Sequence, residues 1–336
     1  QVYAITLLII NFISLNAGLH NSFYVLDSAR FFSLQPRISF RVGPVDRWGV
    51  TGSYTNMTQF QHLLSNSGTG LPTDLFVPAT NRVPPQTARQ FSLGVDRNFK
   101  SLGVQVSLEG YYKQMQNLIE YQTGTNFLMD APWQDLVEKD GVGTSYGLET
   151  FIRKPVGRFR GFLGYTWSKT TRQFPTINDG NPFPYKYDRR HDLSIALIFE
   201  LNDRWEFSGN WVLSSGTMQT FPASIYFPPT TPSFDFLSLN ARPGEDYVID
   251  YGDRNAFRLP AYHRLDLNAR YHLKRKWGEI FWIVGIYNVY IRRYPYFLFL
   301  RADRSVPSED DGQPVVKARK LTLLPILPYV NFGFKF

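Results

Sequence analysis

The chain has 336 residues, a formal net charge of +8 and no cysteine, so disulfides cannot hold its fold together. Aromatic residues make up 16% of it, which excludes a disordered chain, and charged residues make up 19%, below the roughly 25% usual in soluble domains. The sequence also contains no run approaching the roughly 18 apolar residues that a membrane-spanning helix needs.

Taken in chain order, the predicted elements alternate apolar and polar residues with a period of two. This pattern is typical of strands with one apolar and one polar face. Residues 1–24 hold two poorly defined strands of this kind. The clearest examples follow at residues 104–112, 159–167, 193–201, 205–213 and 265–273. We expect about 13 strands in all, and therefore an all-β fold.

The connections between these strands fall into two classes that alternate along the chain. Short turns are predicted at residues 43–47, 100–103, 155–158, 202–204 and 274–278. Long polar segments with Pro and Gly are predicted at residues 64–87, 123–143, 175–189, 216–258 and 301–317. Such alternation predicts an antiparallel meander with tight turns at one rim and loops at the other, and long loops are usually functional.

Two β architectures could carry this alternation. A soluble sandwich would fill its apolar face with Val, Ile and Leu. Here the apolar stripes often end in rings, as at Trp48, Phe159, Trp167, Trp205 and Tyr271. Rings at both ends of an apolar band form the girdles of transmembrane barrels, and several strands reach the roughly 10 residues that span a membrane. We therefore favour a transmembrane antiparallel β-barrel.

The last residues form an amphipathic strand that ends on an aromatic residue. Phe332, Phe334 and Phe336 share one face of it. This strand resembles the closing strand of Gram-negative outer-membrane barrels. The resemblance implies that these three residues are an assembly signal for the barrel-assembly machinery. An ordinary amphipathic last strand is the alternative.

Further motifs resemble segments of TonB-dependent outer-membrane receptors. They are Leu71-Pro-Thr-Asp-Leu-Phe-Val-Pro78, Tyr111–Tyr121, Gly143-Thr-Ser-Tyr-Gly-Leu-Glu149, Gly164-Tyr-Thr-Trp-Ser-Lys169, Tyr187-Asp-Arg-Arg-His-Asp-Leu193, and Asn288-Val-Tyr290 followed by Arg292-Arg-Tyr-Pro295. Each is weak alone, but their combination is specific and spans residues 14–336. Members of this family have a 22-stranded barrel around an N-terminal plug.

The resemblance implies that residues 1–336 are one domain, the C-terminal part of such a barrel, forming an open sheet if the chain is alone. The chain begins at Gln1 with no signal-peptide pattern, and no plug or TonB-contacting segment is found, so we expect a fragment. The implied function is uptake of a scarce nutrient across the Gram-negative outer membrane, by plug-gated transport that TonB energises. Siderophores, cobalamin, glycans and peptides are the candidate nutrients.

The implied partners are outer-membrane lipid and lipopolysaccharide, the TonB complex through the missing plug, the assembly machinery and a small-molecule or oligomeric nutrient. No enzyme, cofactor or metal is predicted. Gly143–Gly147 matches the G-x-S-x-G nucleophile elbow, but an alternating strand follows where that motif needs a helix. The five histidines lack metal-site spacing. The basic residues are scattered instead of clustered, which argues against nucleic acid.

The densest charge cluster is Asp188-Arg189-Arg190-His191-Asp192, where a long loop enters a strand. Three interpretations stay open: a salt-bridged rim that fixes the loop, direct contact with an anionic or sugar-like ligand, and contact with the plug. We include Asp188, Arg189, Arg190 and His191 among the candidate ligand or rim contacts.

Aromatic loops are the second candidate surface. Residues 126–133, which end at Trp133, together with Phe174, residues 183–185 and residues 221–236, are expected to expose rings suited to stacking on a ligand. Packing of the loops against one another is the alternative. Trp133 joins the candidate contacts.

Two rival functions share the barrel. A passive porin-like channel would need its own constriction, and an outer-membrane barrel hydrolase would need a converging Ser/His/Asp or Asp/His group at the rim. A plug sequence upstream would separate all three.

Overall fold

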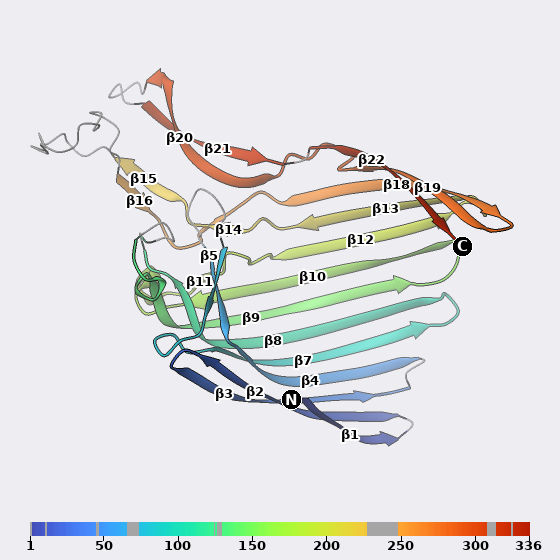
Figure 1. Ribbon diagram of the computed structural model, residues 1–336, viewed down its shortest axis with the longest axis horizontal. Helices are drawn as coiled ribbons and strands as arrows, with labels where there is room; N and C mark the ends of the chain where they lie inside the picture. Colours follow the sequence, from blue (N-terminus) through green and yellow to red (C-terminus); the bar gives the residue numbers. More distant parts are fainter. Residues whose placement is uncertain are drawn as a thin grey trace, which may run out of the picture.

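The computed structural model describes residues 2–10, 12–44, 47–65, 74–123, 125, 130–226, 248–307, 314–323 and 325–336. A single large antiparallel sheet dominates it (Figure 1). Its hydrogen-bonded path contains β1 (Val2–Ile10), β2 (Ile13–Leu26), β3 (Ala29–Val42), β4 (Trp48–Gln59), β7 (Gln86–Phe99), β8 (Val104–Tyr121), β9 (Val137–Lys154), β10 (Phe159–Gln173), β12 (His191–Glu200), β13 (Trp205–Ser214), β18 (Tyr262–Arg275), β19 (Gly278–Tyr287) and β22 (Leu327–Lys335). The predicted all-β class and strand number are confirmed.

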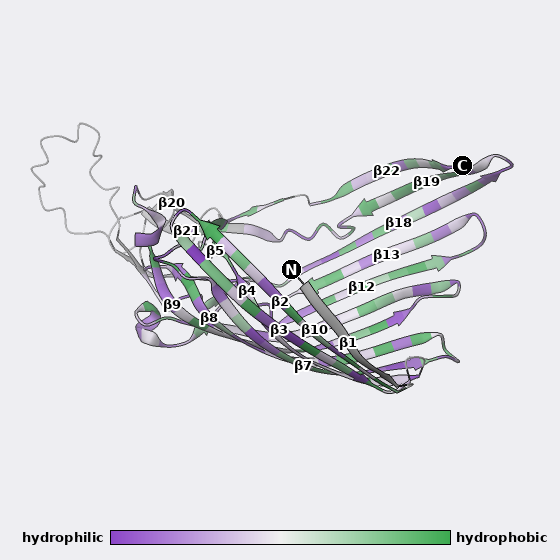
Figure 2. Cartoon of the chain, turned by 60° about the horizontal axis from the view of Figure 1, so that its bottom comes forward, coloured by the Kyte–Doolittle hydropathy of each residue, from purple (hydrophilic) through white to green (hydrophobic). Residues whose placement is uncertain are grey.

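The sheet is curved but not closed, as Figures 1 and 2 show. Within the described residues, β1 pairs only with β2 and β22 pairs only with β19. The open sheet expected from the sequence is therefore confirmed. The last edge of the sheet is β22, which starts at Leu327, whereas residues 321 and 322 belong to a separate hairpin.

One end of the sheet is made of short turns, close to the predicted positions. Gly103 and Gly157 adopt φ of 61° and 104° there, a backbone conformation that glycine tolerates best. Between β12 and β13, the Asn202 Oδ1 accepts hydrogen bonds from the N–H groups of Arg204 and Trp205 at 2.9 and 3.0 Å. These local bonds replace the ladder where the chain reverses.

The long connections lie at the opposite end, and they carry structure of their own. Three hairpins, two short strand pairs and two 3-10 turns occur in the described parts: β5 (Gln61–Ser65) with β6 (Asp74–Pro78), β15 (Pro222–Tyr226) with β16 (Val248–Tyr251), β20 (Pro295–Pro307) with β21 (Pro314–Thr322), β14 (Met218–Gln219) with β17 (Phe257–Arg258), β11 (Phe183–Pro184) with β10, η1 (Trp133–Asp135) and η2 (Ile177–Gly180). None of the helices in the described residues is long and apolar enough to cross a membrane.

The two faces of the sheet differ in chemistry, and Figure 2 shows the alternation along strands such as β12, β13 and β18. One face, here called the apolar face, exposes large hydrophobic side chains in register across neighbouring strands, such as Leu93, Leu197 and Leu267. The other, the polar face, carries ion pairs. Side chains that would fill the core of a soluble sandwich are thus open to the surroundings, as Leu93 is by 62%.

Candidate functional site

The candidate site is the end of the sheet that carries the long connections, here called the loop rim. It comprises the described parts of residues 60–85, 122–136, 174–190, 215–261 and 288–326, with the strand ends beside them. Almost all fully buried side chains of the described residues lie here. The loop rim therefore has a packed interior of its own, whereas the sheet below it is a single layer.

Two apolar clusters hold the rim together. The first contains Leu64, Val77, Val83, Ile119, Tyr121, Leu136 and Val137, and the second contains Leu118, Phe174, Ile177 and Phe183. Strand β8 contributes side chains to both clusters, because its register with β9 shifts beyond Met115 and Asn117 adopts a φ of 57°. Consecutive residues from Leu118 onward are buried on either side of the strand, as expected for a strand end covered on both faces.

The expectation of exposed rings at Phe174 and Phe183 is wrong. Each is 1% exposed, and their ring centroids lie 6.1 Å apart in a stacked pair. Trp133 is partly buried against the first cluster. The loops pack against one another at these positions because apolar rings gain more from mutual burial than from contact with water. Residues 126–129 and 227–236 lie outside the described residues.

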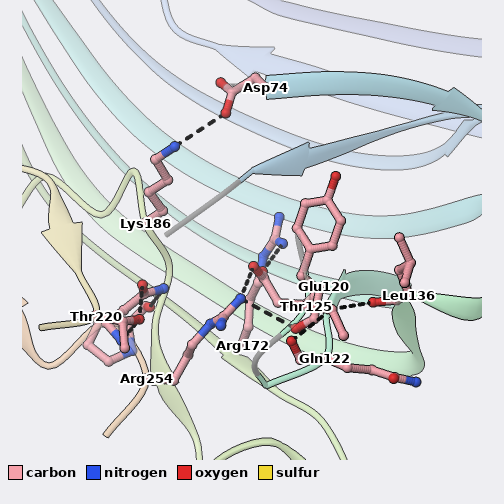
Figure 3. A network of polar contacts seen from close by, with 12 residues as sticks. Asp74, Glu120, Gln122, Thr125, Leu136, Arg172, Lys186, Thr220 and Arg254 are labelled. Atoms are coloured by element: carbon pink, nitrogen blue, oxygen red, sulfur yellow. Dashed lines mark hydrogen bonds and ion pairs between the residues drawn. The ribbon is translucent and has the colours of Figure 1, made fainter. Parts of the chain in front are cut away.

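A buried ion network joins the rim ends of two strands to one of the long connections (Figure 3). The Glu120 carboxylate, 4% exposed, accepts hydrogen bonds from Arg172 at 3.1 Å and from Arg254 at 2.9 Å. The Arg172 guanidinium also lies 3.7 Å from the ring centroid of Tyr185. Two cations thus share one buried anion, which ties β8, β10 and the segment before β17 to one point.

A second polar group connects the β5–β6 hairpin to residues 183–188. Asp74 accepts a hydrogen bond from the Tyr187 hydroxyl and pairs with Lys186 at 3.3 Å. Burial alone would raise the pKa of Asp74, but these two partners outweigh it and hold the pKa below its ordinary value. Burial, followed by the bond to Asp74, raises the pKa of Tyr187, so this phenol stays protonated.

His62 lies at the base of the same hairpin and is fully buried. Its Nε2 lies 3.0 Å from the Pro84 carbonyl and its Nδ1 lies 2.8 Å from Gln86 Nε2. This arrangement suits a neutral ring that donates through Nε2 and accepts at Nδ1. Burial is the main reason that the pKa of His62 falls to about 4.

The predicted charge cluster is split between different surroundings. Asp188 is buried and accepts hydrogen bonds from the Thr170 N–H at 2.7 Å and from Arg258 at 2.5 Å. Arg190 reaches the same carboxylate at 3.6 Å. The Asp188 carboxylate therefore forms its ion pairs inside the rim, as the interpretation of a salt-bridged rim predicts.

Arg189 and His191 lie nearer the surface. Arg189 donates to Ser214 at 3.0 Å and lies 3.8 Å from Asp192, with its side chain 47% exposed. His191 stands in register with Trp167 on the apolar face and shares a 2.8 Å hydrogen bond with the Tyr165 hydroxyl. His191 therefore belongs to the ring-bearing outer wall, away from the polar face.

Sequence reasoning missed a pocket of about 240 Å³ at the ends of β18 and β19. Its lining includes four tyrosines and two arginines: Tyr262, Tyr287, Tyr294, Tyr296, Arg264 and Arg292. Arg264 donates to the Tyr262 and Tyr287 hydroxyls at 2.7 and 2.6 Å and to Asp266 at 2.9 Å. The motif at residues 288–295 was the available signal, but a motif does not reveal that β18 lies beside it.

This Tyr–Arg pocket has the chemistry of an anion-binding site. Arg292 forms no ion pair with the described residues, and its Nε is buried without a hydrogen-bond partner among them. Phenol hydroxyls and guanidinium groups are donors suited to an oxygen-rich anion. No three His, Asp or Glu side chains in the described parts of the chain gather closely enough to hold a metal ion directly.

The polar face below the rim carries charges in register. Arg160 pairs with Glu200 and Glu206, and Arg270 also reaches Glu206, which links β10, β12, β13 and β18. Glu109 and Glu149 are different, because they stand directly opposite each other on β8 and β9. Among the described residues, neither of these two carboxylates has an ion-pair partner.

The predicted assembly signal lies on the apolar face of the last strand and beyond it. Phe332 and Phe334 lie 6.4 Å apart by ring centroid, and Phe334 and Phe336 lie 5.1 Å apart. Phe336 is 87% exposed. These contacts form a continuous row of rings.

Comparisons with known proteins agree on the architecture. The profile of the family described as TonB dependent receptor-like, beta-barrel matches residues 5–289. No curated protein sequence matches the chain. Solved structures do match, at identities that support the fold alone.

Three of these structures are receptors or transporters. The ferripyoverdine receptor of Pseudomonas aeruginosa is 13% identical with a TM-score of 0.57, over 87% of this chain and 34% of that one. The ferric-catecholate import receptor Fiu from E. coli K12 is 12% identical with a TM-score of 0.55, over 99% and 44%. The ferric citrate transporter FecA is 12% identical with a TM-score of 0.59, over 99% and 44%. The chain spans less than half the length of these proteins.

Proposed function

This chain belongs to the TonB-dependent receptor-like β-barrel family, and we propose that it forms part of the wall and loop rim of an outer-membrane receptor that imports a scarce nutrient. The observation that carries the proposal is a wall of 13 strands that exposes the hydrophobic side chains of its apolar face and has a structured rim at one end. In this proposal the rim captures the nutrient outside the cell and the wall surrounds its path.

The apolar face supports a membrane position. On β4, β7 and β8 it carries Leu93 in one cross-strand row, then Tyr54, Phe91 and Tyr112 in the next row toward the rim. Aliphatic side chains suit the hydrocarbon layer, and rings suit its boundary with the headgroups. This order supports a rim that lies outside the hydrocarbon layer, and we propose that the rim faces the extracellular side of a Gram-negative outer membrane.

The polar face supports a plug. Like charges directly opposite each other destabilise a sheet. A positive charge close to the facing carboxylates of Glu109 and Glu149 would offset their repulsion. A plug domain inside the barrel, moved by TonB, would supply that charge with basic side chains. Energy-coupled displacement of that plug then opens the path for the nutrient.

The Tyr–Arg pocket supports an anionic cargo. The three similar proteins described above are named for ferric pyoverdine, ferric catecholate and ferric citrate. All are oxygen-rich iron chelates, and Arg264 and Arg292 with the neighbouring phenols offer matching donors. Within the classes that the sequence left open, we therefore favour a ferric siderophore or a related chelate over cobalamin, glycan or peptide. Iron here is cargo.

The sequence-predicted contacts fit this scheme as secondary elements of the rim. Arg189 and Trp133 are partly accessible and are proposed to contact the nutrient or the loops around it. Arg190 and Asp188 are proposed to hold the rim in shape. The Phe332, Phe334 and Phe336 row is proposed to serve the barrel-assembly machinery.

Uptake of radioactive iron by cells that express the full-length receptor tests the proposal. A panel of ferric citrate, ferric catecholates and ferric hydroxamates is supplied with and without a protonophore. We expect uptake of one class, lost with the protonophore while binding at the cell surface persists. Arg292→Ala should weaken binding, whereas Arg293→Ala, an exposed neighbour outside the pocket, should not. Uptake that ignores the protonophore would indicate a passive channel and overturn the proposal.

A further inference from the structure

A second pocket of the described residues lies in the wall itself, away from the Tyr–Arg pocket. It has a volume of about 360 Å³ and lies where β3 and β4 separate. The β3–β4 ladder stops at Arg37 and Thr55, although β2–β3 and β4–β7 continue further toward the rim. Pro36 follows on β3 and has no N–H to donate, which favours the end of the ladder there.

Two contacts join the separated strands beyond the end of their ladder. The Ser33 and Thr58 hydroxyls lie 2.6 Å apart, and the rings of Tyr24 and Phe60 stack with centroids 4.9 Å apart. The separated strands are thus held at a fixed spacing. The gap between them is part of the fold.

The polar lining follows the apolar face in two cross-strand rows. These rows are Asn56, Arg89 and Gln114, then Thr58, Thr87 and Gln116. The row immediately before them is the ring row of Tyr54, Phe91 and Tyr112. Rings mark the boundary of the hydrocarbon layer, so the pocket opens at the level of the lipid headgroups of the outer leaflet.

The lining has the chemistry of a site for an anionic sugar. Amide and hydroxyl side chains hydrogen-bond sugar hydroxyls, and Phe31 and Phe32 offer ring surface. Arg89 is exposed, no acidic residue lines the pocket, and Arg89 has no ion-pair partner among the described residues. On β3, Leu34 and the exposed Phe32 line the pocket, and the exposed Ile38 and Phe40 continue the apolar face from it toward the short turns. An occupant with a phosphorylated sugar head and acyl chains would match both parts.

We infer that this wall pocket binds the phosphorylated sugar headgroup of an outer-leaflet glycolipid, with Arg89 on its phosphate. The glycolipid would fill the gap between β3 and β4 and present hydrogen-bonding groups to strand edges that have no ladder partner there. The inference rests on the membrane orientation of the proposed function, but it requires neither the plug nor the nutrient.

Native mass spectrometry of the purified full-length receptor in detergent tests the inference. The probes are hexa-acylated lipid A, phosphatidylglycerol, and the phosphorylated glucosamine disaccharide without acyl chains. We expect lipid A to bind best and the bare disaccharide to compete weakly. Arg89→Gln should lower lipid A affinity about tenfold, the scale of one charge-assisted hydrogen bond.

Arg97→Gln is the matched control, because Arg97 lies on the same strand and face but near the opposite, short-turn end. Its affinity for lipid A should match the unchanged receptor. The double variant Gln114→Ala with Gln116→Ala should weaken lipid A while leaving phosphatidylglycerol unaffected. A shift between folded and unfolded bands on unheated gels confirms that each variant is folded.

Three results would overturn the inference. They are equal losses for the Arg89 and Arg97 variants, equal affinity for lipid A and phosphatidylglycerol, and no lipid A binding by the folded receptor. Iron-chelate binding, measured on the same samples, separates this outcome from a failure of the proposed function, because the two pockets share no residue.

Discussion

Replacing Glu120 with Gln should loosen the loop rim without opening the wall. Gln keeps the volume of the side chain but removes the negative charge that Arg172 and Arg254 share. Leaving buried charges uncompensated costs about 3–5 kcal/mol. The three side chains are 4%, 10% and 13% exposed, so slight screening points to the lower end, about 3 kcal/mol.

Backbone hydrogen exchange can measure this loss locally. The Asn255 N–H donates to Thr220 Oγ1 at 3.1 Å, and the Leu259 N–H donates to the Thr217 carbonyl at 2.9 Å. Both bonds depend on the segment that Arg254 anchors. A loss of about 3 kcal/mol should speed their exchange about 100-fold, since each 1.4 kcal/mol is a factor of ten. Amides in the middle of β12 should be unchanged.

Glu138→Gln is the control, because Glu138 stands opposite Glu120 in the β8–β9 ladder and the charge change is the same. Exchange at residues 255 and 259 should stay within about threefold in this variant. If the Glu120 variant also stays within that range, the ion network does not hold the rim, and the reasoning fails. Equal acceleration in both variants would instead point to net charge as the cause.

Other predictions address the hairpin, the wall and the polar face. Hydrogen exchange at the ring C2 position should give His62 a pKa of about 4. Because this pKa lies below the ordinary value of His, the β5–β6 hairpin should be most stable above pH 6.5 and should weaken as the pH falls toward 4. A measured pKa near 6.5 would contradict the burial argument. Leu197→Arg should destabilise the folded barrel by about 2–4 kcal/mol in urea titrations in lipid, and Ser194→Arg much less, while equal losses would favour a soluble core. Phe336→Ala should lower the yield of heat-modifiable barrel in outer membranes, and an unchanged yield would remove its assembly role. Glu149→Gln should make cells more permeable to large antibiotics by loosening the plug, and unchanged sensitivity would argue against that contact.

The repeating wall could be predicted from the sequence because its rules are local. A period of two assigns residues such as Leu197 and Ser194 to opposite faces without knowledge of their neighbours. The short turns follow in the same way from residues such as Gly103, Gly157 and Asn202. The strand order is simple because each strand pairs with the next wall strand along the chain.

The rim could be predicted only in part because its contacts join distant segments. Glu120 and Arg254 are 134 residues apart in sequence, and nothing in the alternation brings them together. Phe174 and Phe183 looked like exposed loop rings, but η2 between them folds both onto β8. The wall pocket depends on where the β3–β4 ladder ends, which the periodic pattern does not specify.

Cysteine labelling in whole cells tests the central claim most directly, because the 336 residues contain no cysteine of their own. Asp130 lies in the loop rim and Asp203 in a short turn at the opposite end, and both are exposed. With cysteine at either position of the full-length receptor, a membrane-impermeant maleimide should label position 130 in intact cells and position 203 only after the cells are broken. Labelling of position 203 but not position 130 would reverse the orientation, and labelling of neither or both in intact cells would contradict a wall that crosses the outer membrane.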